Sequence, residues 1–347
     1  MDTFETDIFN RTKLMQITAG LMTLLFMGLL ALMLLYCKKK VIIVSDYEEN
    51  IVSNEKTETA RDFVWKINTL EGVEKELHIP LHTSLYSCDM DYINNVFRVK
   101  LPDENSKFYI DNMPYGDYSK VKDATGSFDG EYVTYTFALD SCLEAECKLL
   151  SDELLVSFAP INHEKTIVLV DPGHGGNAVG NMAGGLMEKD IALNIADKIQ
   201  KMAQDKDYKV ILTRGGDRKV GTGECISIAN LTKADYYIAI HVDADVEDTK
   251  TFGLRASYNP DFYRAGFENV DFADSLLSSV ALSTSNKAIG LSKAGEDELV
   301  LKVLKIPAAI LYMGYVSNSS EAELLSNDQY LEKIAQGVIE SLDNNIK

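Results

Sequence analysis

Residues 166–176 read TIVLVDPGHGG, and this stretch decides the fold of the C-terminal half of the chain. Its first part, Thr166–Val170, is a short run of β-branched and aliphatic residues, which is typical of a strand buried on both faces. His174 follows the strand between glycines, where the backbone is least crowded. A glycine-rich turn after a strand can also bind phosphate, but this turn matches neither GxGxxG nor GxxxxGKS/T. We therefore expect a histidine presented at the carboxyl end of a buried strand.

From this strand onward, apolar segments with strand-like and helix-like periods alternate along the chain. Such alternation predicts an α/β domain over residues 165–347, with a mainly parallel sheet flanked by helices. Functional side chains are expected at the carboxyl ends of its strands. The predicted strands are Thr166–Val170, Lys209–Thr213, Tyr236–His241 and Pro307–Met313, and the predicted helices are Glu188–Met202, Glu224–Leu231, Val270–Ser283, Glu321–Leu325 and Tyr330–Leu342.

The residues ahead of this domain, 62–160, follow a different pattern. Short segments rich in β-branched and aromatic residues are separated by turn-rich pieces such as Asp111–Gly116 and Gly126–Gly130. This pattern predicts a small all-β domain, in which we identify no catalytic constellation. The predicted strands are Phe63–Ile67, Val96–Leu101, Tyr132–Leu139 and Leu154–Phe158.

An uncharged apolar segment runs from Leu14 to Tyr36, behind a short tail of residues 1–13. It is longer than the about 20 residues that cross a bilayer and than the about 7–15 residues of a signal-peptide core, so we expect an uncleaved transmembrane helix. A polar, acidic linker of residues 37–61 follows. Positively charged residues beside a transmembrane helix tend to stay in the cytoplasm, so the lysines at 38–40 favour, by a narrow margin, a cytoplasmic location of the C-terminal side. Long domains, however, can be translocated regardless of this charge bias.

The overall composition excludes several classes of protein. With 34 basic and 53 acidic side chains the formal net charge is −19, which argues against nucleic acid as a partner because Lys and Arg bind phosphates. A hydrophobic content of 46% excludes global disorder. The five cysteines form no CxxC pair, so neither a disulfide-rich scaffold nor a cysteine zinc site is indicated. Free thiols are favoured, with a local Cys142–Cys147 pair as the alternative.

Two further residues extend the expected site around His174. Glu188 opens a predicted helix, and His241 closes the predicted strand YYIAIH. Two imidazoles and one carboxylate are a ligand set of catalytic zinc sites, which leave a fourth position open. The alternative is structural, because a glutamate in a first helical turn stabilises the helix dipole and a histidine at a strand end is often only a hydrogen-bonding group. Spacing alone leaves both interpretations open.

The ordered motifs of the C-terminal half resemble those of the zinc-dependent N-acetylmuramoyl-L-alanine amidases. They are VDPGHGG at 170–176, Glu188 with Lys189 after a glycine-containing loop, LTR at 212–214, ADYYIAIH at 234–241, and GYVSN at 314–318 followed by Glu321 and Leu324. The resemblance implies zinc bound by His174, Glu188 and His241, and hydrolysis of the amide bond that joins N-acetylmuramic acid to L-alanine in peptidoglycan. A membrane anchor and a β domain ahead of such an amidase is a familiar layout of cell-wall enzymes, in which the β domain resembles a wall-targeting module.

The chain departs from the pattern of that family at three positions. The family's catalytic glutamate, two residues before the glycine of its GF motif, is Tyr312 here. A phenol with a pKa of about 10 donates hydrogen bonds but is a poor base at neutral pH. The asparagine usual after the second histidine is Asp243, which either replaces the missing base, orients His241, or is a solvated turn residue. Cys225 stands where an arginine usually precedes the IAN segment.

Other residues of the motifs are expected to be structural. Asn318 and Glu321 have the spacing of a capping box at a helix start. Arg214, after the predicted strand KVILT, is expected to form an ion pair that stabilises the fold.

The sequence therefore predicts a membrane-anchored cell-wall amidase whose C-terminal domain lies outside the cytoplasm, with Asp243 and Tyr312 as candidate catalytic residues. The alternative is a catalytically weak or inactive relative that binds peptidoglycan or regulates another hydrolase, because Tyr312 replaces the glutamate. A third possibility, a cytosol-facing protein of unknown role, follows if the lysines at 38–40 lie inside the cell.

Overall fold

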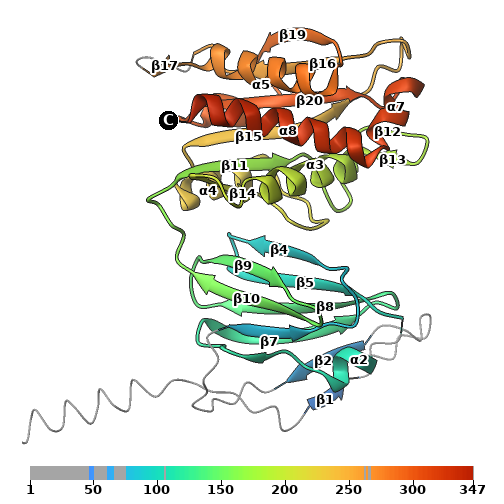
Figure 1. Cartoon of the computed structure of the whole chain (residues 1–347), viewed down its shortest axis with the longest axis vertical. Helices are drawn as coiled ribbons and strands as arrows, with labels where there is room; N and C mark the ends of the chain where they lie inside the picture. The colour runs from blue at the N-terminus through green and yellow to red at the C-terminus, as the bar shows by residue number, and fades with distance from the viewer. Residues whose placement is uncertain are drawn as a thin grey trace, which may run out of the picture.

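The computed structural model describes residues 47–50, 61–65, 76–104, 107–261, 263–264 and 267–346. The predicted tail, the predicted transmembrane helix Leu14–Tyr36 and most of the predicted linker lie outside these residues. Within them, no helix combines the length and the apolar character needed to cross a bilayer. The described chain forms a β domain followed by an α/β domain (Figure 1).

The α/β domain is built on a mainly parallel sheet, as predicted. In the order of the sheet its strands are β14 (Tyr208–Leu212), β11 (Thr166–Pro172), β15 (Tyr236–Asp243), β20 (Ala308–Tyr315), β16 (Leu254–Tyr258) and β19 (Ala288–Lys293). Neighbouring strands are parallel except for β16 and β20, which pair antiparallel. The carboxyl ends of β11, β15 and β20 therefore lie at one edge of the domain.

Helices cover both faces of this sheet, because successive side chains of its buried strands point to opposite faces. Val168 and Val170 of β11 belong to the same apolar core as residues of α3 (Glu188–Met202), α5 (Asn269–Thr284) and α8 (Asp328–Asn345). Figure 1 shows these three helices side by side on one face of the sheet. On the other face, Ile167 and Leu169 belong to the core that includes residues of α4 (Thr222–Thr232) and α6 (Leu299–Val303). The remaining helix, α7 (Ser319–Leu325), connects β20 to α8.

All strands and helices predicted for this domain are present, and α3 spans the predicted residues. The prediction missed β16, β19 and α6. Most side chains of β19 are half-buried or exposed, so no buried apolar pattern marks that edge strand. Two short hairpins were also missed, β12 (Met182–Ala183) with β13 (Leu186–Met187) and β17 (Tyr263–Arg264) with β18 (Phe267–Glu268).

The β domain consists of two antiparallel sheets. The first has the order β1 (Tyr47–Asn50), β2 (Arg61–Trp65), β7 (Val121–Phe128), β8 (Tyr132–Leu139), β5 (Val96–Pro102) and β4 (Ser87–Asp91). The second has the order β6 (Tyr115–Gly116), β3 (Leu77–Pro80), β10 (Glu153–Ala159) and β9 (Glu144–Leu149), and the short helix α2 (Lys107–Asp111) precedes β6. Phe97 joins the sheets, since its ring packs 6.3 Å from that of Phe137 and 5.4 Å from that of Phe158, centroid to centroid.

The β domain begins earlier than the sequence indicates. Tyr47–Asn50, within the predicted linker, pairs antiparallel with β2. The stretch YEEN offers one aromatic residue and no apolar alternation, so its place at the edge of a sheet was not predictable from periodicity.

The described cysteines are free thiols, which is the favoured expectation from the sequence. The alternative of a local pair between Cys142 and Cys147 is wrong. The Cys147 sulfur lies 3.5 Å from the sulfur of Cys88 on β4, so its neighbour comes from the other sheet.

Candidate metal centre

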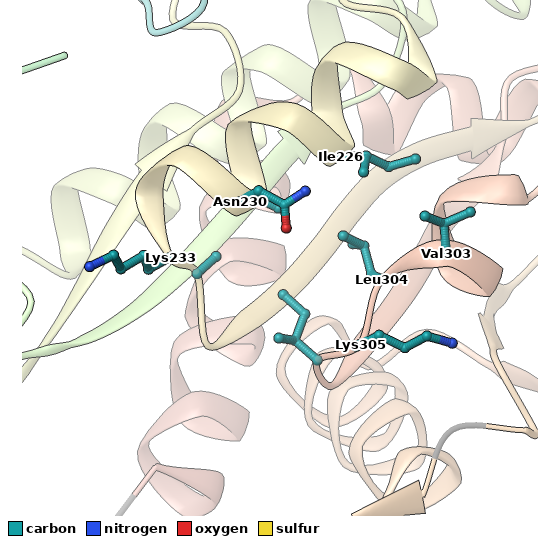
Figure 2. Close-up of a pocket in the computed structure, with 9 residues that line it drawn as sticks. Ile226, Asn230, Lys233, Val303, Leu304 and Lys305 are labelled. Carbon is teal, nitrogen blue, oxygen red and sulfur yellow. The ribbon is translucent and has the colours of Figure 1, made fainter. Parts of the chain in front are cut away.

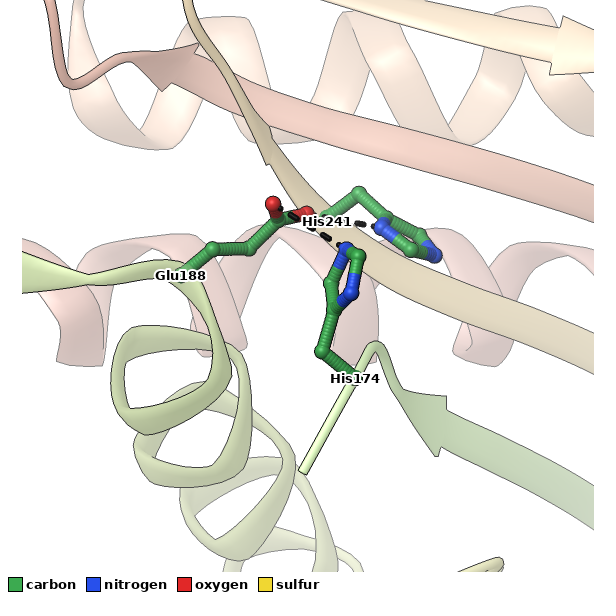
Figure 3. Close-up of side chains that lie close together, drawn as sticks. All are labelled: His174, Glu188 and His241. Atoms are coloured by element: carbon green, nitrogen blue, oxygen red, sulfur yellow. Dashed lines mark hydrogen bonds and ion pairs between the residues drawn. The ribbon is translucent and has the colours of Figure 1, made fainter. Parts of the chain in front are cut away.

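Three side chains predicted from the sequence converge at the carboxyl edge of the sheet in the α/β domain. His174 follows β11, His241 lies near the end of β15, and Glu188 opens α3 (Figure 3). Glu188 Oε1 is 2.7 Å from His241 Nδ1, and Glu188 Oε2 is 3.1 Å from His174 Nε2. One ligand atom from each residue lies within 4.8 Å of the others, and no other cluster of this kind occurs among the described residues.

The Glu188 carboxylate is buried and fully engaged. Its side chain is 1% exposed, and it accepts hydrogen bonds from the backbone N–H groups of Asn181 (2.7 Å) and Val242 (3.0 Å). Burial by itself raises the pKa of the Glu188 carboxyl, but hydrogen bonds from His174 and His241 outweigh burial and hold the pKa well below its usual range. The site therefore contains a buried negative charge between two imidazoles.

This donor set fits a zinc ion. Zinc takes imidazole nitrogens and carboxylate oxygens, and catalytic sites use three protein ligands with one open position. The side chains of His174 and His241 are 33% and 24% exposed, so the imidazoles face solvent on one side while Glu188 closes the other. Among the described residues, the buried charge of Glu188 has only the histidines and two backbone N–H groups as partners. A cation between the three side chains would be compensated by that charge.

The glycine-rich turn around His174 has a steric explanation. His174 itself has a left-handed backbone, with φ +64°, which is unfavourable for a residue with a side chain. A Cβ on Gly173 would lie 2.4 Å from Cε1 of His241, and a Cβ on Gly180 would lie 2.5 Å from Oε2 of Glu188. These glycines leave room for the side chains of the metal centre.

Arg214 holds the segments that carry His174 and Glu188, although not by the ion pair expected from the sequence. Its side chain is fully buried and donates to the carbonyl oxygens of Pro172 (2.9 Å), Gly173 (3.0 Å), Lys189 (2.9 Å) and Gly216 (3.0 Å). Gly173 precedes His174 and Lys189 follows Glu188, so one guanidinium fixes the backbone beside two of the three site residues. The expected role in stabilising the fold stands, with carbonyl groups as its partners.

Replacing Arg214 with methionine should lower the free energy of unfolding by about 3 kcal/mol or more, because buried carbonyl groups would lose donors that carry a charge. Chemical denaturation monitored by circular dichroism measures this change. The control is Lys201→Met, at an exposed position of α3. An Arg214→Met protein that unfolds at the same denaturant concentration as the wild type would contradict the prediction.

Tyr312 lies next to His241 on the neighbouring strand, since the two residues are partners in the β15–β20 register. Its hydroxyl group donates a 2.7 Å hydrogen bond to Oε1 of Glu298, and the Arg255 guanidinium lies 3.4 Å from the centre of its ring. Burial and the Glu298 carboxylate raise the pKa of Tyr312. The phenol is therefore protonated at neutral pH and acts as a hydrogen-bond donor.

Asp243 is engaged by the same arginine. Its Oδ2 accepts a 2.5 Å hydrogen bond from Nε of Arg255. The register between β15 and β20 shifts after His241, so that Asp243 pairs with Tyr315, and Gly314 in the shifted segment has φ +121°. The structure thus joins the two candidate catalytic residues through Arg255.

Sequence reasoning missed Arg255 and Glu298. Arg255 lies on β16 and Glu298 immediately before α6, both elements absent from the prediction. Glu298 is 9% exposed, and its Oε2 accepts a 2.7 Å hydrogen bond from the N–H of Gly295. Neither residue belongs to a motif, so only the tertiary contacts reveal them.

The other departures and motif residues have structural environments. Cys225 donates to Oδ2 of buried Asp171 (3.3 Å), which also accepts from the hydroxyl group of Tyr237. Asn318 caps α7 as predicted, accepting from the N–H groups of Ser320 and Glu321. The Glu321 side chain accepts instead from the N–H groups of Gly253 and Tyr315, so it joins β20 to the start of β16 rather than completing a capping box.

A pocket of about 320 Å³ lies away from the metal centre, between α4 and the segment that connects α6 to β20 (Figure 2). Ile226, Asn230, Val303 and Leu304 are among the residues that line it. It is at the amino ends of β15 and β20, whereas His241 lies near the carboxyl end of β15. The pocket therefore has no part in the site described above.

The chain is similar to several known proteins over about half of its length. An uncharacterized protein of Bacillus subtilis is 25% identical over 181 residues, which cover 52% of this chain and 85% of that protein. The germination-specific N-acetylmuramoyl-L-alanine amidase of the same species is 28% identical over 190 residues, covering 51% of this chain and 78% of the relative. Among solved structures, the N-acetylmuramoyl-L-alanine amidase of Clostridium difficile 630 is 25% identical with a TM-score of 0.49, covering 52% of this chain and 97% of its own.

The sequence model of one protein family, described as N-acetylmuramoyl-L-alanine amidase, matches residues 168–344. This range includes about half of the chain and all three residues of the metal centre. The chain therefore belongs to the N-acetylmuramoyl-L-alanine amidase family.

Proposed function

We propose that this protein is a zinc-dependent amidase that hydrolyses the bond between N-acetylmuramic acid and L-alanine in peptidoglycan. The observation that carries the proposal is the convergence of His174, Glu188 and His241 at one edge of the sheet in a chain that belongs to the amidase family. The printed name of the related Bacillus subtilis protein, a germination-specific N-acetylmuramoyl-L-alanine amidase, supports the same reaction.

His174, Glu188 and His241 would hold the zinc ion. Bound zinc would polarise the scissile carbonyl group and activate a water molecule, by lowering the pKa of water toward about 7. Glu188 supplies a charge that is already present at neutral pH, because its pKa is held low. The backbone N–H groups of Asn181 and Val242 fix the orientation of this carboxylate, and Arg214 fixes the turn beside His174.

We assign Tyr312 and Asp243 as the further catalytic residues. Tyr312 lies beside His241 with a protonated hydroxyl group, which suits it to donate a hydrogen bond to the oxygen on which negative charge develops. Donation to substrate would require this hydroxyl group to leave Glu298. Asp243 is the candidate proton acceptor, and accepting a proton would weaken its ion pair with Arg255. Breaking these two contacts costs free energy during the reaction, which favours a slow enzyme over a fast one.

The second candidate function is a catalytically weak or inactive protein that binds peptidoglycan or regulates another hydrolase. The observation that favours it is Tyr312, which occupies the position of the family's glutamate and cannot act as a base at neutral pH. Loss of a positioned general base typically costs a factor of about 10² to 10⁴ in rate.

Digestion of purified peptidoglycan by the full-length protein in detergent tests the proposal. We expect soluble stem peptides with N-terminal alanine, whose release stops on chelation and returns when zinc is added. A Glu188→Gln variant should release none, whereas Glu323→Gln, at an exposed position of α7, should behave as the wild type. Binding to peptidoglycan without release of peptides would support the second function.

We propose that Leu14–Tyr36 anchors the protein in the cell membrane as a single helix, with the β domain and the α/β domain outside the cytoplasm. A cell-wall hydrolase meets its substrate only on that side, and this argument outweighs the narrow bias of the lysines at 38–40. The β domain, next to the membrane segment in the chain, is proposed to contact the wall.

Labelling of a single cysteine tests this orientation. Glu332→Cys places a thiol on the exposed side of α8, in a chain whose native cysteines are replaced by serine. A membrane-impermeant thiol reagent should label it in intact cells once the wall is permeabilised. Labelling that requires cell lysis would contradict the proposed orientation.

A further inference from the structure

We infer that the β domain holds the metal-binding turn of the amidase domain in place, through Asp89 on β4 and Arg218 in the loop after β14. Asp89 is thus a positioning residue for the metal centre although it lies in the other domain. This inference rests on the proposed function in one respect only, namely that His174 is a metal ligand.

The two domains are in contact at Asp89. Asp89 is buried, and its Oδ2 accepts hydrogen bonds from Nε of Arg218 (3.2 Å) and from Nη1 of Arg98 on β5 (3.3 Å). Its Oδ1 accepts a 2.9 Å hydrogen bond from the N–H of Gly215. Figure 1 shows β4 as the strand of the β domain that faces the α/β domain. One carboxylate therefore binds both a side chain and the backbone of the loop after β14.

The backbone of the loop after β14 approaches the backbone of β4 closely. A Cβ on Gly215 would lie 2.3 Å from the carbonyl oxygen of Cys88, and a Cβ on Gly216 would lie 3.1 Å from Cβ of Asp89. A side chain on Gly215 would push β4 away from this loop. Gly215 and Gly216 therefore allow the loop after β14 to lie in direct contact with β4.

The loop after β14 also contacts the turn that carries His174. The carbonyl oxygen of Arg218 lies 2.1 Å from the place where a Cβ of Gly175 would be, so the loop packs directly on the residue after His174. Asp217 Oδ1 accepts a 2.7 Å hydrogen bond from the N–H of Gly176, and its Oδ2 forms a 2.6 Å ion pair with Nζ of Lys189. The loop thus contacts the segments that follow His174 and Glu188.

The backbone of His174 itself has a left-handed conformation. A left-handed non-glycine residue persists only where the surroundings fix it, and such residues concentrate at functional sites. Arg214 fixes the turn before His174, at the carbonyl oxygen of Gly173. The loop that Asp89 and Arg218 hold fixes the turn after it. Loosening that loop should let His174 relax away from the geometry in which it faces Glu188.

Zinc affinity of the full-length protein, measured by competition with a chromophoric chelator, tests the inference. Asp89→Asn keeps the size of the side chain and an acceptor for Gly215, but it loses the ion pairs with Arg218 and Arg98. We expect about tenfold weaker zinc binding, the lower end of the 10- to 100-fold range for partners that orient metal ligands. Asp152→Asn, at an exposed position of the same domain, should bind zinc as the wild type does.

Arg218→Gln approaches the same ion pair from the other domain and serves if Asp89→Asn does not fold. The double variant should bind zinc within about twofold of the weaker single variant, because either change alone already removes the ion pair between Asp89 and Arg218. A purely structural role would lower the unfolding temperature while the folded variants keep wild-type zinc affinity, and that result would overturn the inference. A wild type that binds zinc but cleaves no peptidoglycan would contradict the proposed function and leave the inference standing. A wild type without zinc affinity would overturn both.

Discussion

The wild type should be purified with one zinc ion per chain, and His174→Ala and His241→Ala proteins should be purified without it. Each change removes one of three ligands from a site in which no fourth protein side chain lies close enough among the described residues to compensate. Removing a residue that only orients a metal ligand weakens metal binding by up to about 100-fold. Removing a ligand itself should weaken zinc binding by more than this. Peptidoglycan hydrolysis should fall with the metal.

Elemental analysis after dialysis measures this loss, and two controls separate it from misfolding. His163→Ala, at an exposed position between the domains, should keep its zinc. Circular dichroism should show an intact β domain in the ligand variants, because all three substituted residues belong to the α/β domain. Equal zinc contents in the wild type and both ligand variants would refute the assignment of the metal centre.

Tyr312→Glu should raise peptidoglycan hydrolysis by a factor of about 10² to 10⁴, which is the contribution of a positioned general base. The native phenol stays protonated because burial and Glu298 raise its pKa, so it contributes a donor where the family has a carboxylate. Residue 312 pairs with His241 across the sheet, so the new carboxylate would lie beside the metal centre. The Arg255 guanidinium next to it would compensate its charge.

Tyr312→Gln is the matched control, since it has nearly the shape of the glutamate variant and cannot accept the proton. Initial rates of stem-peptide release from the same peptidoglycan preparation compare the variants. If Tyr312→Glu and Tyr312→Gln release peptides at the same rate, the identity of residue 312 does not limit the reaction.

Asp243→Asn completes this comparison. We expect modest hydrolysis by the native protein, because the three proposed metal ligands are present although Tyr312 stands where a glutamate was expected. If Asp243 accepts the proton, Asp243→Asn should abolish that hydrolysis without releasing zinc. A native protein that binds zinc and peptidoglycan without turnover, indistinguishable from Asp243→Asn, would favour the second proposed function.

The elements that carry His174, Glu188 and His241 were predictable because their sequence signals are strong. Thr166–Val170 and Tyr236–His241 are continuous apolar strands, and the periodic helix that Glu188 opens was predicted with its observed bounds. Parallel strands place their carboxyl ends at one edge, so the convergence of His174 and His241 follows from the topology.

The residues around Tyr312 were not predictable, because they belong to elements with weak local signals. Arg255 lies on the short strand β16, and Glu298 precedes the five-residue helix α6. Their roles depend on which side chains the folded chain brings together. The same holds for Arg214, whose partners are carbonyl oxygens of other segments, and for Asp89, which accepts a hydrogen bond from Arg218 of the other domain. A sequence pattern records neither kind of contact.

The most direct test of the proposed function is the reaction of the full-length protein with a defined disaccharide-peptide fragment of peptidoglycan, analysed by mass spectrometry. We expect two products whose masses sum to that of the substrate plus one water, a disaccharide with a free lactyl carboxylate and a stem peptide with N-terminal L-alanine. Removal of zinc should leave the substrate intact. Cleavage within the stem peptide or at the glycosidic bond, or an intact substrate with the zinc-loaded protein, would contradict the account.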